Sequence, residues 1–332
     1  MILDGREPAS IAAAAQTLQA GELVALPTET VYGLGADAGN DAAVARIFAA
    51  KGRPADHPLI VHVADAAGVA HFARDIPDFA QRLLQAFWPG PLTLILPRRD
   101  GIGAAAAGGQ DTIGLRCPAH PVAHALLLAA RALGVQGVAA PSANQFGRVS
   151  PTCAEHVRDE FDAELLILDG GACAVGIEST IIDCTRGAPV LLRPGAITRE
   201  QVQAASGQRL RGRDELEAPA PRASGTLASH YAPRARVRLM DSKPLQAALE
   251  VLGTDIDQGK ARIAVYARSL LKTPSRSVLY RRMPDDADAT AQQLFAVLRE
   301  FDAQGVSLIW IETPPDTPAW EGVRDRINRA AA

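Results

Sequence analysis

The sequence predicts an α/β protein, and three observations support that class. Short runs of aliphatic residues alternate with amphipathic stretches along most of the 332 residues, as expected where strands and helices interleave. Apolar residues make up 48% of the chain and charged residues 21%, a balance that allows a substantial core. Several later strand candidates stand close together, which favours a mixed sheet over a purely parallel one.

The predicted elements of the first two-thirds follow in order. Residues 23–26 have the aliphatic character of a strand and precede a polar, glycine-rich passage. Residues 41–50 predict a helix because Val44, Ile47 and Phe48 fall on one helical face. Further helices are predicted over residues 79–87 and 121–133, and further strands over residues 59–63, 91–96, 113–116, 138–140, 165–168, 180–183 and 190–192.

A change of composition near Gln208 predicts a second domain. Residues 214–225 are first charged and then rich in Pro, Ala and Gly, as linkers are. We therefore expect a main domain over residues 1–208, a linker over residues 209–233 and a small Rossmann-like α/β domain over residues 234–332. The strands of the small domain are predicted over residues 236–240, 262–266, 278–281 and 307–311, and its helices over residues 289–301 and 320–330.

The bulk properties argue against several classes. A formal net charge of −3 opposes a generally basic coat for nucleic acid, although a local basic groove stays compatible with it. The first residues lack the basic start and apolar run of a signal peptide, and no apolar stretch is long enough to cross a bilayer. The four cysteines form no Cys-x-x-Cys pair, which predicts small buried side chains in a reduced, cytoplasmic protein.

Lys51 is the only lysine in the first 242 residues of a chain that otherwise uses arginine for positive charge. It stands one glycine from Arg53, and a point charge beside a planar fork suits a polyphosphate. The alternative is a solvated helix end, because cations are favourable at a helix C-terminus. Position alone does not separate the two interpretations.

Five polar loops favour a ligand site in the main domain, because α/β proteins bind ligands on such loops. Each combines hydroxyls or cations with Gly or Pro, and any one of them alone is more simply explained as a turn. Five in one domain weaken that explanation. The loops are residues 27–35, 51–58, 141–144, 176–180 and 193–195.

Standard signatures do not explain these loops. No Gly-x-x-x-x-Gly-Lys phosphate loop occurs. Gly33-x-Gly35-x-x-Ala38 fits the dinucleotide fingerprint only loosely, because the next helix is predicted to begin too late to carry a pyrophosphate. His120 and His124 share a helical face without the His-Glu-x-x-His pattern of zinc sites, and no Ser stands in a Gly-x-Ser-x-Gly elbow.

Taken in order, the motifs resemble those of the threonylcarbamoyl-AMP synthase family, whose main domain has the YrdC-like fold. The resemblance covers residues 8–208, and residues 230–233 with the tail resemble the longer, two-domain branch. It implies a twisted mixed sheet with helices and a concave active-site groove. The matching stretches are Leu26-Pro-Thr-Glu-Thr-Val-Tyr-Gly-Leu-Gly35, Lys51-Gly-Arg-Pro54, Phe87-Trp-Pro-Gly-Pro-Leu-Thr93, Gly114-Leu-Arg-Cys-Pro118, Pro141-Ser-Ala-Asn144, Gly176-Ile-Glu-Ser-Thr180 and Leu192-Arg-Pro-Gly195.

The resemblance implies that L-threonine, bicarbonate (or CO₂) and ATP with Mg²⁺ give threonylcarbamoyl-AMP and pyrophosphate, the first step toward threonylcarbamoyladenosine in tRNA. It implies a downstream threonylcarbamoyl-transferase complex as partner. The composition predicts no membrane contact and disfavours stable nucleic-acid binding without excluding it. The resemblance places catalytic roles on Lys51, Arg53 and Arg193. It places ATP on Lys51, Arg53, His57, Thr112, Ser142, Asn144, Ser150, Arg193, His230 and Tyr231. It places threonine on Thr30, Tyr32, His62, Arg116, Ala140 and Ser179.

The chemistry of these side chains agrees with that division. Arg116 offers a bidentate fork for a carboxylate, and Thr30 and Ser179 offer neutral partners for a hydroxyl. The three cations Lys51, Arg53 and Arg193 suit the negative charge of a triphosphate. No nucleophile stands out, so we expect carbamate formation followed by attack on the α-phosphate without a covalent enzyme intermediate. The linker is expected to act as a lid that excludes water, the alternative being a passive tether.

Some points stay open in the sequence. Glu29 and Glu178 suit either loop bracing or a magnesium contact, and His57 stands where much of the family has asparagine. Phe87 and Trp88 are expected in the core rather than stacked on substrate. Two other classes remain, an RNA-binding module and a carbamoyl-transfer enzyme on the same fold. The negative charge opposes the first, and the lack of zinc-finger cysteines opposes the second.

Overall fold

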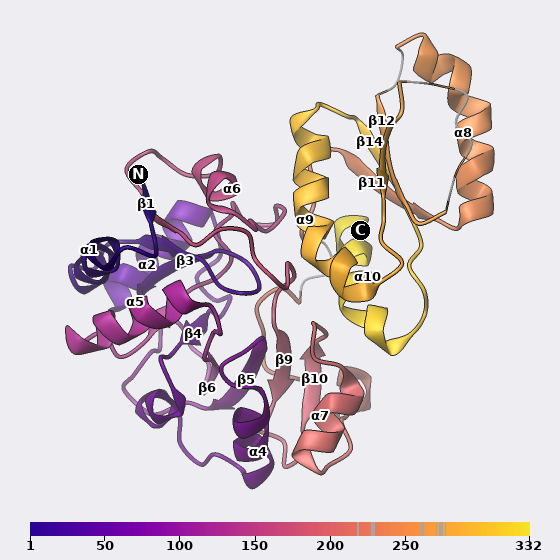
Figure 1. Cartoon of the computed structure of the whole chain (residues 1–332). Coiled ribbons are helices and arrows are strands. Elements are labelled where there is room, and N and C mark those ends of the chain that lie inside the picture. Colours follow the sequence, from indigo (N-terminus) through magenta and orange to yellow (C-terminus); the bar gives the residue numbers. More distant parts are fainter. Residues whose placement is uncertain (218, 227–229, 260–261, 270, 272–274, 276) are drawn as a thin grey trace. The chain divides into compact units, whose positions relative to one another are not determined.

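The computed structural model describes residues 1–332 except 218, 227–229, 260–261, 270, 272–274 and 276. The chain forms two compact units (Figure 1). The first comprises Met1–Phe146 and Ser150–Thr226, and the second comprises Gly147–Val149 and residues 227–332. Parts of the predicted linker, at 218 and 227–229, lie outside the described residues. Its residues up to Thr226 belong to the first unit.

The first unit is built on a ten-stranded sheet in the order β1-β8-β2-β3-β7-β4-β6-β5-β9-β10. The sheet contains parallel pairs such as β4 with β6 and antiparallel pairs such as β5 with β6, so the predicted mixed sheet is confirmed. The strands are β1 Ile2–Asp4, β2 Val24–Leu26, β3 Gly33–Asp37, β4 Ile60–His62, β5 Leu92–Pro97, β6 Thr112–Arg116, β7 Val138–Ala139, β8 Leu166–Asp169, β9 Thr180–Asp183 and β10 Val190–Arg193.

Helices cover both faces of this sheet. Because side chains alternate along a strand, Val24 and Leu26 pack into the cluster under α1 and α5, whereas Ala25 packs into the cluster that contains residues of α2, α4 and α7. The helices are α1 Pro8–Gln19, α2 Asp41–Lys51, α3 Val69–Phe72, α4 Asp78–Phe87, α5 Pro121–Ala132, α6 Ala154–Arg158 and α7 Arg199–Ser206, with the short 3-10 turns η1 Ala66–Gly68 and η2 Arg213–Glu215.

Helix α2 ends at Lys51, one of the predicted ATP-binding residues. Its N-cap Asn40 accepts hydrogen bonds from the backbone N–H groups of Ala42 and Ala43, which fixes the start of the helix. Gly52 adopts a left-handed conformation with φ of 60°, which stops the helix directly after Lys51. The lysine therefore lies in the last helical turn.

Strand β3 was not predicted, and packing explains why it is rich in glycine. A Cβ atom on Gly35 would lie 2.8 Å from Val138 Cγ1 and 2.9 Å from Leu26 Cδ2, closer than real contacts allow. A Cβ on Gly33 would lie 3.1 Å from the Cβ of Ala140. Glycine thus permits β3 to lie against β2 and β7, although its sequence has little β-propensity.

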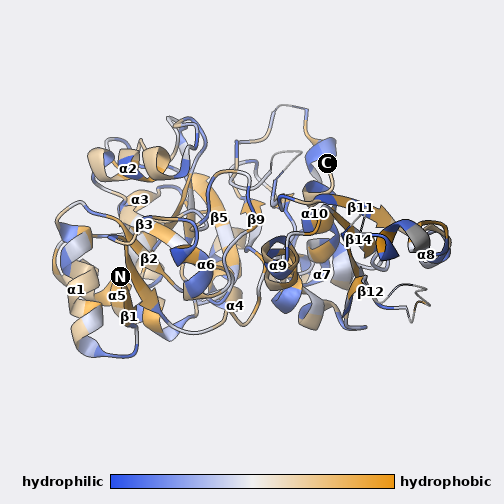
Figure 2. Ribbon diagram, turned by 90° about the horizontal axis from the view of Figure 1, so that it is seen from above, coloured by the Kyte–Doolittle hydropathy of each residue, from blue (hydrophilic) through white to orange (hydrophobic). Residues whose placement is uncertain are grey.

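The second unit has a parallel four-stranded sheet in the order β11-β14-β12-β13, which fits the predicted Rossmann-like domain. Helix α8, which was not predicted, lies on one side of the strands, and α9 lies on the other (Figure 2). The strands are β11 Arg236–Met240, β12 Ile263–Ala267, β13 Leu279–Arg282 and β14 Leu308–Glu312. The helices are α8 Ser242–Asp257, α9 Ala287–Ala303 and α10 Glu321–Ala330, preceded by the turn η3 Pro318–Trp320.

Candidate active site

The candidate site lies in the first unit, on the face of the sheet opposite α2 and α4. A pocket on this face is lined by residues of β4, β5, β6 and β9, including Thr93, Thr112 and Gly114. Strand alternation places His62 and Arg116 on the same face as their second neighbours Ile60 and Gly114. The groove predicted from the resemblance is therefore floored by side chains from adjacent strands.

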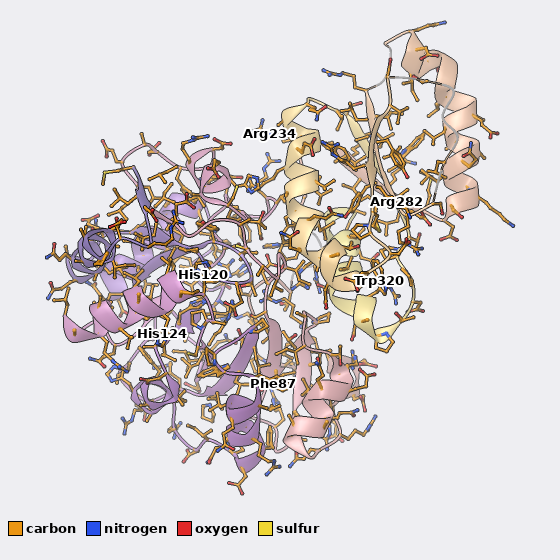
Figure 3. The ribbon with its side chains drawn as sticks, in the orientation of Figure 1. Phe87, His120, His124, Arg234, Arg282 and Trp320 are labelled. Atoms are coloured by element: carbon orange, nitrogen blue, oxygen red, sulfur yellow. The ribbon has the colours of Figure 1, made fainter. Side chains whose placement is uncertain are left out.

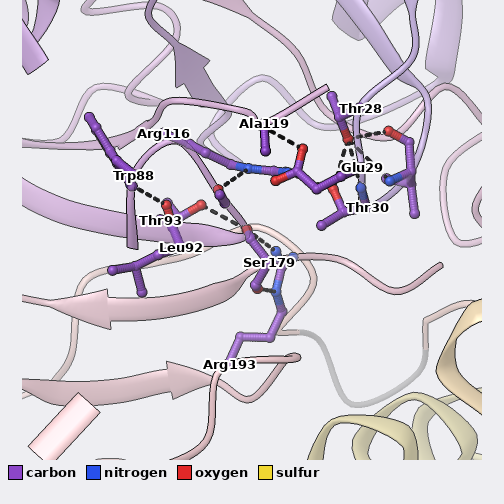
Figure 4. A network of polar contacts seen from close by, with 12 residues as sticks. Thr28, Glu29, Thr30, Trp88, Leu92, Thr93, Arg116, Ala119, Ser179 and Arg193 are labelled. Carbon is purple, nitrogen blue, oxygen red and sulfur yellow. Dashed lines mark hydrogen bonds and ion pairs between the residues drawn. The ribbon is translucent and has the colours of Figure 1, made fainter. Parts of the chain in front are cut away.

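Arg116 is the centre of a buried polar network (Figure 4). Its side chain is 3% exposed. Nη1 donates to Thr30 Oγ1 at 2.7 Å, Nε donates to Gly90 O at 3.2 Å, and Nη2 lies 2.7 Å from Glu29 Oε1. The second oxygen of Glu29 accepts a hydrogen bond from the Ala119 N–H at 3.0 Å. Glu29 thus holds the guanidinium in place while the arginine keeps further N–H groups for a ligand.

Ser179 joins this region to a second arginine. Its Oγ lies 2.8 Å from Thr93 Oγ1, and Arg193 Nη2 donates to it at 3.2 Å. Arg193 Nε also donates to the Ser179 carbonyl at 3.1 Å. The register between β9 and β10 shifts between Leu191 and Arg193, and such irregularities re-aim side chains.

Lys51 is buried, with 2% of the residue exposed, so the solvated helix end is excluded. Nζ donates to the carbonyl of Ser142 at 2.6 Å and to the carbonyl of Asn144. These contacts tie the end of α2 to the loop over residues 141–144. Burial, and then the charge of Arg53, lowers the pKa of Lys51 well below its usual value.

Arg53 and His57 lie together in the loop over residues 51–58, and the side chains of both contact the ring of Phe146. Arg53 Nη2 donates to Pro58 O at 3.0 Å, and its guanidinium lies 5.6 Å from the ring centroid of Phe146. The ring of His57 also lies 5.6 Å from that of Phe146. Burial, followed by Arg53, lowers the pKa of His57, so its imidazole is neutral at physiological pH.

Three further predicted residues have defined surroundings. Ser150 is fully buried and donates its hydroxyl hydrogen bond to Glu178. Thr112 lines the pocket at the start of β6. Ala140 follows β7 and its N–H donates to the Ile60 carbonyl at 2.9 Å, which fixes the backbone beside β4. No finding tests their predicted ligand contacts.

His62 is 3% exposed on β4, in register with Arg116 on the neighbouring strand. Burial, followed by the charge of Arg116, lowers the pKa of His62 to about 3. The imidazole is therefore neutral and offers one donor and one acceptor beside the arginine.

Tyr32 lies apart from this network. Its hydroxyl donates to the Gly171 carbonyl at 2.8 Å and accepts from the Gly170 N–H at 3.1 Å, just beyond β8. The residue is fully buried. These contacts engage the hydroxyl in the protein, and a contact with substrate stays a prediction.

Residues 222–224 of the predicted linker lie on the groove. The backbone N–H of Arg222 donates to Gln110 Oε1 at 2.8 Å, and Gln110 Nε2 donates back to the Arg222 carbonyl at 3.2 Å. The Arg222 side chain pairs with Asp56 at 2.5 Å. The carbonyl of Ser224 accepts from Arg193 Nη1 at 2.9 Å. We call these contacts of residues 222–224 the linker latch. No motif in the sequence pointed to Gln110.

His230 and Tyr231 belong to the second unit. The Tyr231 ring lies 5.4 Å from that of Phe295, and the guanidinium of Arg326 lies 5.5 Å from the Tyr231 ring centroid. The His230 ring lies 4.2 Å from the Tyr231 ring. Their predicted contact with ATP is untested.

Other sequence candidates have structural roles. His120 caps α5, where its Nδ1 accepts from the Val122 N–H at 3.2 Å, and His124 follows one turn later (Figure 3). Within the part of the chain that the structure describes, no group of three or more His, Cys, Asp or Glu residues could hold a metal ion. Phe87 and Trp88 pack against the hydrophobic core, as predicted. None of the described helices is long and apolar enough to span a membrane.

Two family models together match almost the whole chain. A model described as "Telomere recombination" matches residues 16–195, and one described as "Threonylcarbamoyl-AMP synthase, C-terminal domain" matches residues 197–332. With the mixed sheet and its polar groove, these matches define a nucleotidyltransferase-type enzyme with a YrdC-like main domain.

Curated relatives and solved structures agree. The threonylcarbamoyl-AMP synthase of Bacillus subtilis is 39% identical, over 97% of this chain and 92% of that protein. That of Pyrococcus abyssi is 38% identical, over 96% and 93%. A crystal structure of P. abyssi Sua5 complexed with L-threonine matches with a TM-score of 0.88 at 37% identity, over 100% of this chain and 97% of that one. The chain belongs to the threonylcarbamoyl-AMP synthase family, which confirms the resemblance read from its motifs.

Proposed function

We propose that this enzyme converts L-threonine, bicarbonate or CO₂, and ATP into threonylcarbamoyl-AMP and pyrophosphate, for use by a threonylcarbamoyl-transferase complex that modifies tRNA. The observation that carries the proposal is the continuous buried network from Glu29 through Arg116 and Thr30, beside the Thr93, Ser179 and Arg193 cluster (Figure 4). It sets a buried guanidinium and its hydroxyl partner close to a second cation.

Threonine is proposed to bind on the Arg116 side. The guanidinium, held by Glu29, would take the carboxylate, and Thr30 and Ser179 would pair with the threonine hydroxyl. Neutral His62 would add a polar contact without adding charge. The threonine-bound structure of the P. abyssi relative supports this substrate. Tyr32 and Ala140 are proposed to shape the pocket from behind.

ATP is proposed to bind on the Arg193 side, where Arg193 and Arg53 supply positive charge and Lys51 fixes the loop over residues 141–144. Buried cations stabilise developing phosphate charge more strongly than exposed ones do. The remaining nucleotide contacts are proposed for His57, Thr112, Ser142, Asn144, Ser150, His230 and Tyr231.

The proposed reaction needs positioning rather than a nucleophile. The threonine amine and CO₂ join as a carbamate, with loss of one proton. A carbamate oxygen then attacks the α-phosphate, and the bond to the bridging oxygen of pyrophosphate breaks. Arg116 would orient the amino acid while Arg193 and Arg53 offset the charge on the phosphates.

Magnesium is proposed to arrive with ATP. The carboxylate of Glu178 and the hydroxyl of Ser150 are buried next to Ser179 and are oxygen donors, the type that Mg²⁺ takes. Bound Mg²⁺ would neutralise phosphate charge. We propose that these two residues hold the ion or one of its waters.

The linker latch is proposed to act as a lid. Ser224 occupies an N–H of Arg193, which a phosphate oxygen would need, so the segment over residues 222–224 must move when ATP binds. The latch contacts of Arg222 with Gln110 and Asp56 do not involve Arg193, and through them the segment would stay over the bound substrates and keep water from the carbamate, which hydrolyses readily.

The test is pyrophosphate release by the purified protein with each substrate omitted in turn. We expect release only with threonine, bicarbonate and ATP together. Serine, which lacks one methyl, should react about 10- to 200-fold less well, and valine, which lacks the hydroxyl, about 10⁴-fold less well. Release without threonine, or equal release with valine, would contradict the proposal.

A further inference from the structure

The second unit contains a hollow that the proposed reaction does not use. It has a volume of about 540 Å³ and lies between the strand β11 and the helix α8. Its described lining consists of two arginines, Ser307 and apolar side chains, and includes no carboxylate. The lining residues used here are Arg236, Arg238, Met240, Leu252, Leu308 and Trp310.

The hollow exists because α8 is centred on the inner strands. Leu245 and Leu249 of α8 pack in one cluster with Ile263 and Val265 of β12. Strand β11 is an edge strand, and β14 separates it from β12 (Figure 2). The helix therefore leaves part of the β11 face uncovered, and the partly exposed side chains of this strand border the hollow.

Strand β11 presents its arginines to this hollow. Arg236 and Arg238 are exposed, whereas Val237 between them is buried on the opposite face. On the other end strand, by contrast, Arg282 pairs with Asp285 at 3.0 Å. In the described residues no acidic group pairs with Arg236 or Arg238. Two cations beside an apolar floor attract an anionic ligand with an apolar part.

The outer edge of β11 is a template for another strand. Arg236 N–H donates to Ser307 O at 3.1 Å, and Met240 O accepts from Thr313 N–H at 3.0 Å. In a parallel ladder this register turns the polar backbone groups of residues 236, 238 and 240 toward β14. The N–H and C=O groups of Val237 and Leu239 therefore face away from the sheet.

We propose that this surface binds an extended acidic segment of a partner protein, which adds to β11 as a fifth strand. Its carboxylates, spaced two residues apart, would pair with Arg236 and Arg238, and an aliphatic side chain would enter the hollow over Leu252 and Leu308. Backbone pairing gives affinity in such complexes, and alternate side chains give specificity. The floor is aliphatic and Trp310 is only 3% exposed, so a stacking face for nucleic-acid bases is missing from the described lining.

The experiment measures binding of a fluorescent synthetic peptide to the full chain by anisotropy. In this alternating peptide of about seven residues, a usual strand length, two Glu and then one Val occupy every second position and Thr the others, so the two carboxylates and the aliphatic side chain share one face. A control peptide has the same composition with its Glu residues grouped at one end. We expect saturable binding of the alternating peptide that weakens with added salt, and weaker binding of the control.

Three variants locate the binding. The double change Arg236→Ala and Arg238→Ala should weaken it about tenfold. The control Arg282→Ala, on the opposite edge strand (Figure 3), should leave it unchanged. Leu239→Pro removes an N–H that faces away from β14, so the sheet should survive while strand addition is lost. Pyrophosphate release should equal that of the parent in all three, which separates this surface from the reaction.

Four outcomes would overturn the proposal. The first is no binding of either peptide, and the second is binding that is insensitive to the arginine changes or to Leu239→Pro. The third is arginine-dependent binding of single-stranded RNA in place of the peptide. The fourth is self-association that the double change abolishes, which would make a second copy of this chain the occupant.

Discussion

Replacing Lys51 with methionine tests the most specific charge in the sequence. The change keeps the length of the side chain and removes its charge and its donors. The carbonyls of Ser142 and Asn144 would then lack their donor, at a cost of about 1–3 kcal/mol each. The same change removes a buried ammonium, whose desolvation costs several kcal/mol. Because these terms oppose each other, we expect the free energy of unfolding to change by less than about 2 kcal/mol.

Turnover should fall much further than stability. In the proposed site Lys51 fixes the loop over residues 141–144 against the nucleotide. A shift of about 1 Å in the position of bound groups can lower turnover roughly a hundredfold, which corresponds to about 3 kcal/mol. The effect should appear in kcat and in the KM for ATP, while the KM for threonine changes little, since Arg116 is untouched.

The assay is pyrophosphate release at varied ATP and threonine, with unfolding in urea measured in parallel. Lys243→Met is the matched control, because Lys243 is an exposed lysine in the second unit. Near-normal turnover in Lys51→Met would refute the reasoning and leave Lys51 as a buried tie between α2 and the loop. A loss of turnover that merely follows unfolding would refute it equally.

Three further changes probe the rest of the site. Arg116→Lys keeps the charge but loses the fork, so the KM for threonine should rise about 10- to 100-fold; an unchanged KM would remove Arg116 from the pocket. Arg222→Ala weakens the latch by one exposed ion pair, so the KM for ATP should fall by up to about fivefold, and a rise would contradict competition between latch and ATP. His62 has its pKa lowered to about 3 in the folded protein, so the unfolded chain binds one more proton between that pH and about 6.5. Stability is then lost as pH falls through this window, by about 2 kcal/mol from about pH 6.5 to about pH 5. In urea unfolding over the same pH range, His62→Gln should lose less stability than the parent protein, and His124→Gln should lose as much as the parent. Equal losses in the two variants would contradict the assignment of this effect to His62.

Local signals were sufficient for much of the fold. The strands over residues 180–183 and 236–240 were predicted with the bounds that the structure has, the first from its two isoleucines and the second from the alternation of arginine with apolar residues. Several elements were not predicted, and α1 and β3 show why. Helix α1 has a run of alanines, which favours a helix but gives a weak apolar period, and β3 is a strand only because glycine fits against Val138 and Leu26.

The site was predictable as a set of motifs but not as a geometry. Arg116 and Thr30 stand in separate motifs, and only the sheet order brings them within 2.7 Å. Glu29 pairs with Arg116, which is the kind of contact that loop bracing predicts. The latch could not be predicted from the sequence, because only tertiary folding brings Gln110 and Arg222 together.

The partners of the buried cations determine how substrate binding is coupled to the linker. Arg116 and Arg193 already have acceptors inside the protein, so a substrate gains only the difference between its own contacts and those it displaces. For Arg193 the displaced acceptor is the Ser224 carbonyl, which belongs to the latch. One N–H cannot serve both groups at full strength. In the proposed site, whatever tightens the latch therefore weakens ATP binding by the same free energy, and bound ATP loosens the latch equally.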